Sequence, residues 1–198
     1  KENKIPKEPE FLYGICIDSL DVKLDTIKKN QFLANIMLKQ NIDYNTITHI
    51  EKKHKDVFDI RKIKPGHKHT FLLKRDSLAT PLFWIYEIDK INYAVFSLTD
   101  SLTAWRGEKT VDVKTEYIEG VITTSLWNAI KDVDGDPNLT MELSDIYSWT
   151  VDFFGIQPGD TFKVVYENKY IQDECIGMGN ILACYLNNAG SKHYAYYF

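Results

Sequence analysis

Two histidines with strand spacing come nearest to a metal site in this sequence. His67 and His69 flank Lys68, and residues i and i+2 of a strand point to one face, so their imidazoles could share a metal ion. Zinc needs further ligands, and neither His49 nor His54 begins an H-x-x-x-D pattern. We therefore interpret the pair as solvated residues of a strand edge beside a turn. We predict no catalytic, cofactor-binding or metal-binding residue.

Two polar segments carry oxygen groups without completing a site. The segment 132–136 alternates aspartates as a calcium loop does, but its glycine is the fourth residue and Leu143 stands where glutamate would close the site. The hydroxyls of residues 123–125 and of Ser144 have no histidine in the same segment that could act as a base. We interpret these segments as a loop between helices, helix caps and polar helix faces.

Aromatic rings could bind sugars by stacking against them. Trp127 lies on an apolar helical stripe, and Trp149, Phe153 and Phe154 lie in a mostly apolar segment. We therefore expect these four rings to pack in a core rather than to form a binding platform. Trp105 lies in a polar context and is expected to be exposed.

The composition describes a folded chain and excludes several classes. The 198 residues are 44% hydrophobic and 13% aromatic, and the formal net charge of -4 offers no basic surface for nucleic acid. Apolar stretches reach about seven residues, far short of the roughly 18 to 20 that a transmembrane helix needs. Cys16, Cys175 and Cys184 have no metal or redox spacing and are expected to be small buried residues.

The first part of the chain has the pattern of a strand, two helices and a second strand. We predict a strand over 11–18, helices around 32–37 and 47–54, and a strand over 67–73. The I-K-P-G sequence at 63–66 predicts a type II turn that enters the last strand, because proline presets φ and glycine accepts a positive φ.

The second part is richer in strands. A hairpin is predicted from 81–88 and 93–98, followed by a strand up to Gly120, two short helices, and an I-Q-P-G turn that leads into three more strands. The pattern indicates two α+β units joined near residue 77. The two I-x-P-G turns are interpreted as a way of entering a strand and not as a sign of duplication.

Several segments resemble a known family. GVITTSLW, MELSDIYSWTVDFF, QPGDTFKVVYE, ILACYLNNAG and YAYYF, in this order between residues 120 and 198, resemble the second non-catalytic domain of lysostaphin/LytM-type murein endopeptidases. Residues 28–73 resemble the LysM-like domain that precedes it, including the K-P-G before a strand. Lys29-Asn30-Gln31 stands where that domain usually has Gly-Asp.

The resemblance implies a domain order and an absent enzyme. The charged, proline-bearing first ten residues indicate a flexible tether, over 1–12, or a plain solvated terminus. The resemblance implies a LysM-like domain over 13–77 and a β-rich accessory domain over 78–198. In this family a zinc peptidase domain follows, with H-x-x-x-D and H-x-H ligand motifs, and the two motifs do not occur together here. Zinc is therefore expected in a catalytic domain outside this chain, and the chain itself is expected to hydrolyse nothing.

The resemblance also implies partners and a location. The expected partners are peptidoglycan and the protein's own C-terminal peptidase domain, in the bacterial cell envelope, with a leader absent from this chain. Asn30 and Gln31 before the first helix, and Asp59 and Arg61 after the second, would be the glycan contacts. The alternatives are a stand-alone envelope scaffold module and a cytosolic enzyme with an unfamiliar site.

Overall fold

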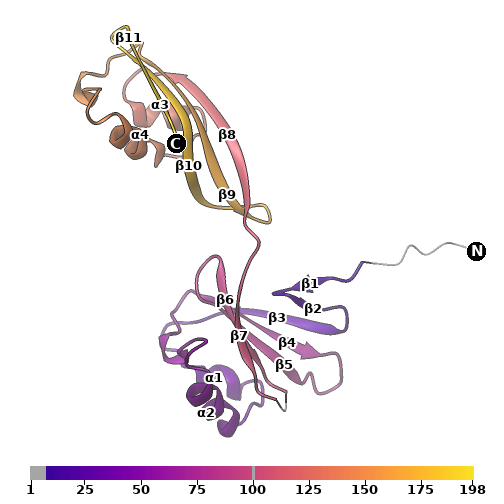
Figure 1. Cartoon of the computed structure of the whole chain (residues 1–198). Coiled ribbons are helices and arrows are strands. Elements are labelled where there is room, and N and C mark those ends of the chain that lie inside the picture. Colours follow the sequence, from indigo (N-terminus) through magenta and orange to yellow (C-terminus); the bar gives the residue numbers. More distant parts are fainter. Residues whose placement is uncertain (1–7, 100) are drawn as a thin grey trace, which may run out of the picture. The chain divides into compact units, whose positions relative to one another are not determined.

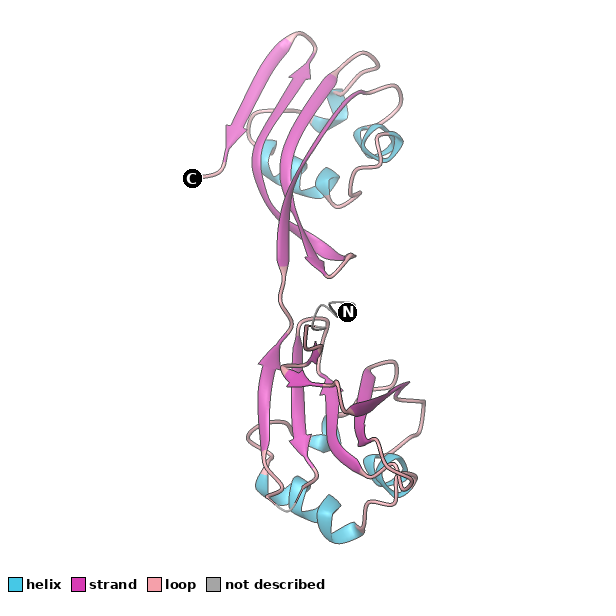
Figure 2. Ribbon diagram, turned by 90° about the vertical axis from the view of Figure 1, so that its right-hand side faces the viewer, coloured by secondary structure: helices cyan, strands magenta, loops and turns pink. Residues whose placement is uncertain are grey.

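The computed structural model describes residues 8–99 and 101–198, which form antiparallel sheets with helices packed on one face (Figures 1 and 2). The described residues contain eleven strands in three sheets and four short α-helices, which confirms the predicted α+β class. Contacts divide the chain into two units between Thr110 and Val111. None of the described helices is long and apolar enough to cross a membrane.

The first unit is built on a five-stranded sheet with the strand order β3-β4-β5-β6-β7. Its two α-helices and one 3-10 helix lie between β3 and β4 in the sequence. The elements are β1 (Phe11–Leu12), β2 (Ile15–Cys16), β3 (Leu20–Thr26), α1 (Leu33–Leu38), α2 (Tyr44–Lys53), η1 (Ile60–Lys62), β4 (Lys68–Lys74), β5 (Pro81–Glu87), β6 (Asn92–Ser97) and β7 (Ala104–Glu108).

Both faces of this sheet are covered. Phe71 of β4 and Trp84 of β5 pack with Ile36 and Ile50 of the helices on one face. The next residue of β4, Leu72, points to the opposite face, because side chains alternate along a strand. There the N-terminal hairpin covers a second core made of Leu20, Leu72, Ile85, Tyr93 and Val95.

The N-terminal segment differs from its prediction. The predicted strand over 11–18 is a short hairpin, because Tyr13 (φ 53°) and Gly14 (φ 76°) turn the chain back at its middle. The hairpin includes part of the predicted tether, whose residues 1–7 lie outside the described residues. The prediction lacks β3, in which Leu20, Val22 and Leu24 alternate with charged residues; only Leu20 is buried, because β3 lies at the edge of the sheet.

The two helices of the first unit begin at residues of different kinds. Asp43 caps α2, as its carboxylate accepts a hydrogen bond of 2.8 Å from the backbone N–H of Thr46. Phe32 precedes α1, and the backbone N–H of Phe32 donates a hydrogen bond to the side chain of Asn35.

The second unit has a four-stranded sheet in the order β8-β9-β10-β11, with its helices on one face (Figure 2). Ile118, Phe162, Val164 and Leu186 point from the strands into the helix-covered core. The elements are β8 (Asp112–Val121), α3 (Leu126–Asp132), α4 (Leu139–Tyr147), η2 (Phe153–Gly155), β9 (Thr161–Ile171), β10 (Glu174–Asn188) and β11 (Ser191–Tyr196).

The boundary between the units lies further along the chain than expected. Phe71 of β4 pairs with Trp84 of β5, and Trp84 pairs with Phe96 of β6. The sheet of the first unit therefore continues through β7, and the predicted junction near residue 77 is wrong. The hairpin that was assigned to the second domain completes the first one.

The two units repeat one architecture. The order strand, helix, helix, 3-10 helix, turn and three strands occurs in both, and the first unit adds β7 and the β1–β2 hairpin. The backbone N–H of Gly66 donates to the carbonyl of Ile27, and Gly159 donates in the same way to Ile122, both at 2.8 Å. Pro65 corresponds to Pro158 in these turns. The echoed turns therefore do mark an internal structural repeat, contrary to the expectation from the sequence.

The cysteines are free and differ in exposure. Cys184 is buried in the second core, as expected, whereas Cys16 and Cys175 are exposed. Cys16 ends β2 of the N-terminal hairpin, and Cys175 lies near the hairpin tip between β9 and β10. Strand tips have too few neighbours to bury a side chain, so the expectation of burial is wrong for these two.

Candidate glycan-contact site

The residues predicted to contact glycan lie in two loops of the first unit that are anchored to each other. Ile27, which directly follows β3, donates to the carbonyl of His67 and accepts from Gly66. Asn30 and Gln31 follow Ile27, whereas the segment with Asp59 and Arg61 leads into the turn at Gly66. The fold therefore brings the bases of both loops to the same end of the β3–β4 pair.

Asp59 and Arg61 form a paired group. Both oxygens of the Asp59 carboxylate accept hydrogen bonds of 2.8 Å from the Arg61 guanidinium, and this contact holds the pKa of Asp59 well below its usual range. Asp59 also caps η1 through the backbone N–H of Arg61. The Arg61 side chain is 59% exposed, so the pair presents guanidinium donors with little net charge.

The first loop has a different polar chemistry. Asn30 is exposed in the left-handed region with φ of 61°, and Gln31 accepts a hydrogen bond of 2.8 Å from the backbone N–H of Lys28. Within the described residues, no hydrogen bond or ion pair joins this loop's two predicted contacts to Asp59 or Arg61. The structure therefore shows no direct link between the two pairs, and their use as one contact site stays a prediction.

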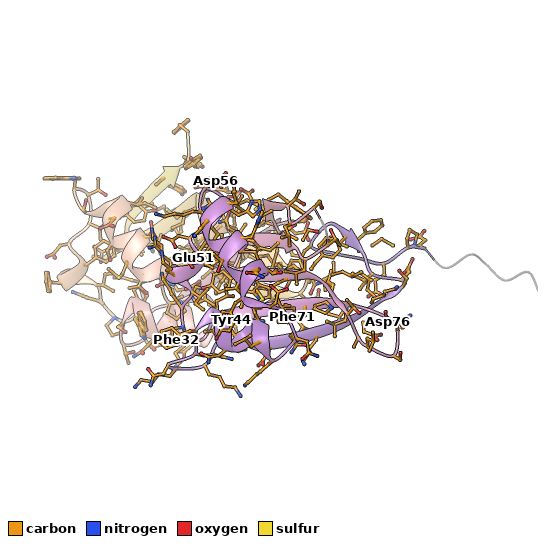
Figure 3. All side chains as sticks on the ribbon, turned by 90° about the horizontal axis from the view of Figure 1, so that it is seen from below. Phe32, Tyr44, Glu51, Asp56, Phe71 and Asp76 are labelled. Atoms are coloured by element: carbon orange, nitrogen blue, oxygen red, sulfur yellow. The ribbon has the colours of Figure 1, made fainter. Side chains whose placement is uncertain are left out.

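Two exposed rings at the starts of the helices were not among the predicted contacts. Phe32 precedes α1 and Tyr44 begins α2, and they are 71% and 64% exposed (Figure 3). Phe32 begins the helix predicted around 32–37, but its ring is not part of the buried stripe of α1. That stripe consists of Leu33, Ile36 and Met37, because Phe32 precedes the first helical turn.

The histidine pair is not a solvated strand edge. His69 is 2% exposed, because β4 lies between β3 and β5, and burial lowers its pKa. The indole N–H of Trp84 donates to Nδ1 of His69, and His67 Nδ1 lies 3.0 Å from the carbonyl oxygen of Glu87. Within residues 8–99 and 101–198, no three or more histidine, cysteine or acidic side chains are grouped to hold a metal ion.

The expectation that four aromatic rings are buried is wrong for three of them. Trp127, Trp149 and Phe154 are 47%, 96% and 102% exposed, and Phe153 packs against the core. Leu126, Ala129 and Ile130 form the buried face of α3, and Trp127 lies off that face. Trp105, which was expected to be exposed, is 38% exposed.

Comparison with curated proteins identifies two kinds of relative. The chain is 35% identical over 103 residues to the peptidoglycan DD-endopeptidase ShyC of Vibrio cholerae, over 50% of this chain and 24% of ShyC. It is 20% identical over 175 residues to the DD-carboxypeptidase/endopeptidase Mpg of Neisseria meningitidis, over 87% of this chain and 40% of Mpg. The chain thus spans 24% to 40% of the length of these relatives. No family model matches it.

Solved structures share the fold. A zinc-containing peptidase from Vibrio cholerae matches 88% of this chain and 54% of its own with a TM-score of 0.58 and 16% identity. Csd3 from Helicobacter pylori matches 88% of this chain and 47% of its own with a TM-score of 0.56 and 16% identity. The homologues are therefore peptidoglycan endopeptidases, and the structural neighbours are peptidase and Csd3 chains.

Proposed function

We infer that this chain is a non-catalytic accessory region of a zinc peptidoglycan endopeptidase of the LytM type, acting in the bacterial cell envelope. Its role would be to position the peptidase domain on peptidoglycan or to cover the peptidase cleft. The observation that carries this proposal is the match to ShyC. The chain is 35% identical to that relative, and the match covers only 24% of the length of ShyC.

The proposed role of this chain is binding, and the zinc chemistry is assigned to another domain. The grouped side chains that a zinc site requires are absent from residues 8–99 and 101–198. His69 is buried in the first unit, where water and substrate have little access, and His67 is half-buried. Zinc would be held by a domain outside this sequence.

The two possible roles require different contacts. Positioning requires affinity for the glycan or peptide of the wall, and the LysM-like assignment of the first unit would provide it through Asn30, Gln31, Asp59 and Arg61. Covering a cleft requires an equilibrium between docked and released domains, which a few kcal/mol of interface free energy shifts almost completely.

Co-sedimentation with purified peptidoglycan sacculi tests the binding role. The intact 198-residue chain should pellet with the sacculi, and simultaneous alanine substitution of the four predicted contacts should reduce the pelleted fraction. A wild-type chain that stays in the supernatant at every sacculus concentration argues against positioning. If the fourfold alanine variant pellets as the wild type does, the four residues are not the contacts with peptidoglycan.

The reading frame that follows the codon for Phe198 tests the parent enzyme. An H-x-x-x-D motif followed by an H-x-H motif supports the accessory role. A stop codon at that position favours the alternative, a stand-alone envelope scaffold module without peptidase activity.

A further inference from the structure

The internal repeat allows the two sheets to be compared residue by residue. In the first unit Thr70 pairs with Ile85, and Ile85 pairs with Val95. Ile85 and Val95 are fully buried, because the N-terminal hairpin packs on this face through residues that include Tyr13 and Ile15. The face opposite the helices is therefore an aliphatic surface closed by a segment of the same unit.

In the second unit the corresponding positions have a different character. Lys163 pairs with Tyr185, and Tyr185 pairs with Tyr194. These side chains point away from the helices, since their neighbours Val164 and Cys184 lie in the core. Tyr194 is 59% exposed, and within residues 111–198 no segment covers this face as the hairpin covers its counterpart.

The outward side chains form one surface, which we call the tyrosine face and define as Tyr117, Glu119, Lys163, Tyr185 and Tyr194; Tyr185 is half-buried and Tyr117 and Tyr194 are exposed. The rings of Tyr185 and Tyr194 are 5.0 Å apart, and Lys163 lies beside Tyr185 in the ladder. Lys163 and Glu119 form an ion pair of 2.7 Å, and the Tyr117 hydroxyl donates to Glu119 at 2.6 Å. The surface crosses all four strands, about 14 Å at the usual ladder spacing.

The chemistry of the tyrosine face selects among ligands. A segment like the first unit's hairpin packs on aliphatic side chains, whereas the tyrosine face presents rings, hydroxyls and an ion pair that is about half exposed, with Val121 and Val165 beside them on the same side of the sheet. The paired charges cancel, so neither a polyanion nor a cation is favoured. A sugar ring matches this surface, because its C–H face packs on an aromatic ring and its hydroxyl groups both donate and accept hydrogen bonds.

We propose that the tyrosine face is a saccharide-binding platform for a chain of linked amino sugars, as in the glycan strand of peptidoglycan. The rings of Tyr185 and Tyr194 stack on sugar rings, and Lys163, Glu119 and Tyr117 bind their hydroxyl and amide groups. The choice of amino sugars rests on the proposed function. The platform is distinct from the predicted contacts in the loops of the first unit.

The sheet makes this surface suitable for binding. Its side chains stand on paired strands, so little backbone ordering accompanies binding, and the rings of Tyr185 and Tyr194 already contact each other in the free protein. An extended glycan can therefore lie across the strands on a preformed surface.

Titration of the intact chain with a soluble N-acetylglucosamine oligomer, followed by NMR or calorimetry, tests the proposal. The double variant Tyr185→Ala/Tyr194→Ala should bind about tenfold or more weakly, since aromatic anchors dominate such contacts. Tyr117→Ala should weaken binding by a smaller factor. The matched control is Trp149→Ala, which removes a 96% exposed ring outside the tyrosine face and should bind as the wild type does. Thermal unfolding of each variant verifies that the second unit is folded.

The outcomes separate this proposal from the proposed function. Equal binding of the oligomer by the wild type and the double variant overturns the tyrosine face, even if the chain sediments with sacculi. Binding of the oligomer that is lost in the double variant supports the face, even if the chain does not sediment. A concentration-dependent dimer that the double variant abolishes, without oligomer binding, identifies a second copy of the chain as the occupant and overturns the proposal.

Discussion

The hydroxyl of Tyr13 donates a hydrogen bond of 2.6 Å to the carboxylate of Glu87, which is 74 residues further along the chain. The other carboxylate oxygen of Glu87 lies 2.8 Å from the ammonium group of Lys109, and Glu87 is only 9% exposed. The hydrogen bond between Tyr13 and Glu87 joins the N-terminal hairpin to β5. Burial, reinforced by the hydrogen bond to Glu87, raises the pKa of Tyr13 far above its usual value.

Tyr13→Phe should destabilise the first unit by about 1.5 to 3 kcal/mol, the range for a hydrogen bond to a charged group. The substitution keeps the ring, which packs edge-on against Tyr93 at 5.0 Å, so the loss reports the hydroxyl. Urea unfolding, followed through amide exchange of β5, measures the change. Tyr44→Phe, at a ring that is 64% exposed, is the matched control and should leave the midpoint unchanged.

His69 should make the first unit less stable as the pH falls. Burial lowers the pKa of His69 in the folded state, opposed by Asp25 on β3 and assisted by Lys23. The unfolded chain binds the proton more readily, because its histidine has a pKa of about 6.5. The contribution of neutral His69 to the free energy of unfolding is therefore fully present above about pH 6.5 and is lost as the pH falls below that value. Urea unfolding of the first unit at pH 7.5 and pH 5 measures the difference.

The control for the pH effect is His69→Gln, which retains an acceptor for the indole N–H of Trp84. This variant should show a smaller fall in stability between the two pH values than the wild type shows. The same fall in both proteins would assign the pH dependence to other groups.

Gly66→Ala and Gly159→Ala should each destabilise their own unit by about 1 to 2 kcal/mol. Both glycines have positive φ, 88° and 101°, and a new methyl group would meet no atom within 4 Å at either site. The effect therefore comes from the backbone conformation alone and should be alike in the two units. Thermal unfolding that resolves the two units measures it.

Gly155→Ala is the control for these substitutions. Its φ lies outside the left-handed region, and a new Cβ would lie at an ordinary contact distance of 3.6 Å from Asp152. The corresponding residue of the first unit is Lys62, so a side chain fits this position of the repeat. A loss at Gly155 as large as the loss at Gly159 would contradict the backbone explanation.

Ile27→Ala and Ile122→Ala should each destabilise by about 2 to 4 kcal/mol, because each removes a buried side chain that packs beneath a helix pair. Ile27 is 2% exposed and Ile122 is 0% exposed. The effect should be confined to the unit that carries the substitution, which hydrogen exchange measured separately in the two sheets would reveal. Val113→Ala, at a side chain that is 53% exposed in β8, should have little effect.

Local features were predictable because they depend on neighbours in the sequence. Both P-G turns have the expected positive φ at glycine, and the strands β5 and β6 form the expected hairpin. The cap of α2 by Asp43 is a contact of the same local kind. The contact between Asp59 and Arg61 is also local, since a single residue separates the two. Each depends on backbone dihedral angles or on contacts within a few residues.

The sequence alone determined the α+β class, the order of most elements and the turns, because alternation, caps and Pro-Gly pairs act locally. Tertiary structure decided which faces are covered. Strand β4 is interior, so His69 is buried, and a hairpin far away in the sequence closes the face that holds Ile85. The same architecture leaves Tyr194 exposed in the second unit, because burial depends on which distant segments pack on a sheet, and that is not encoded in the spacing of its own residues.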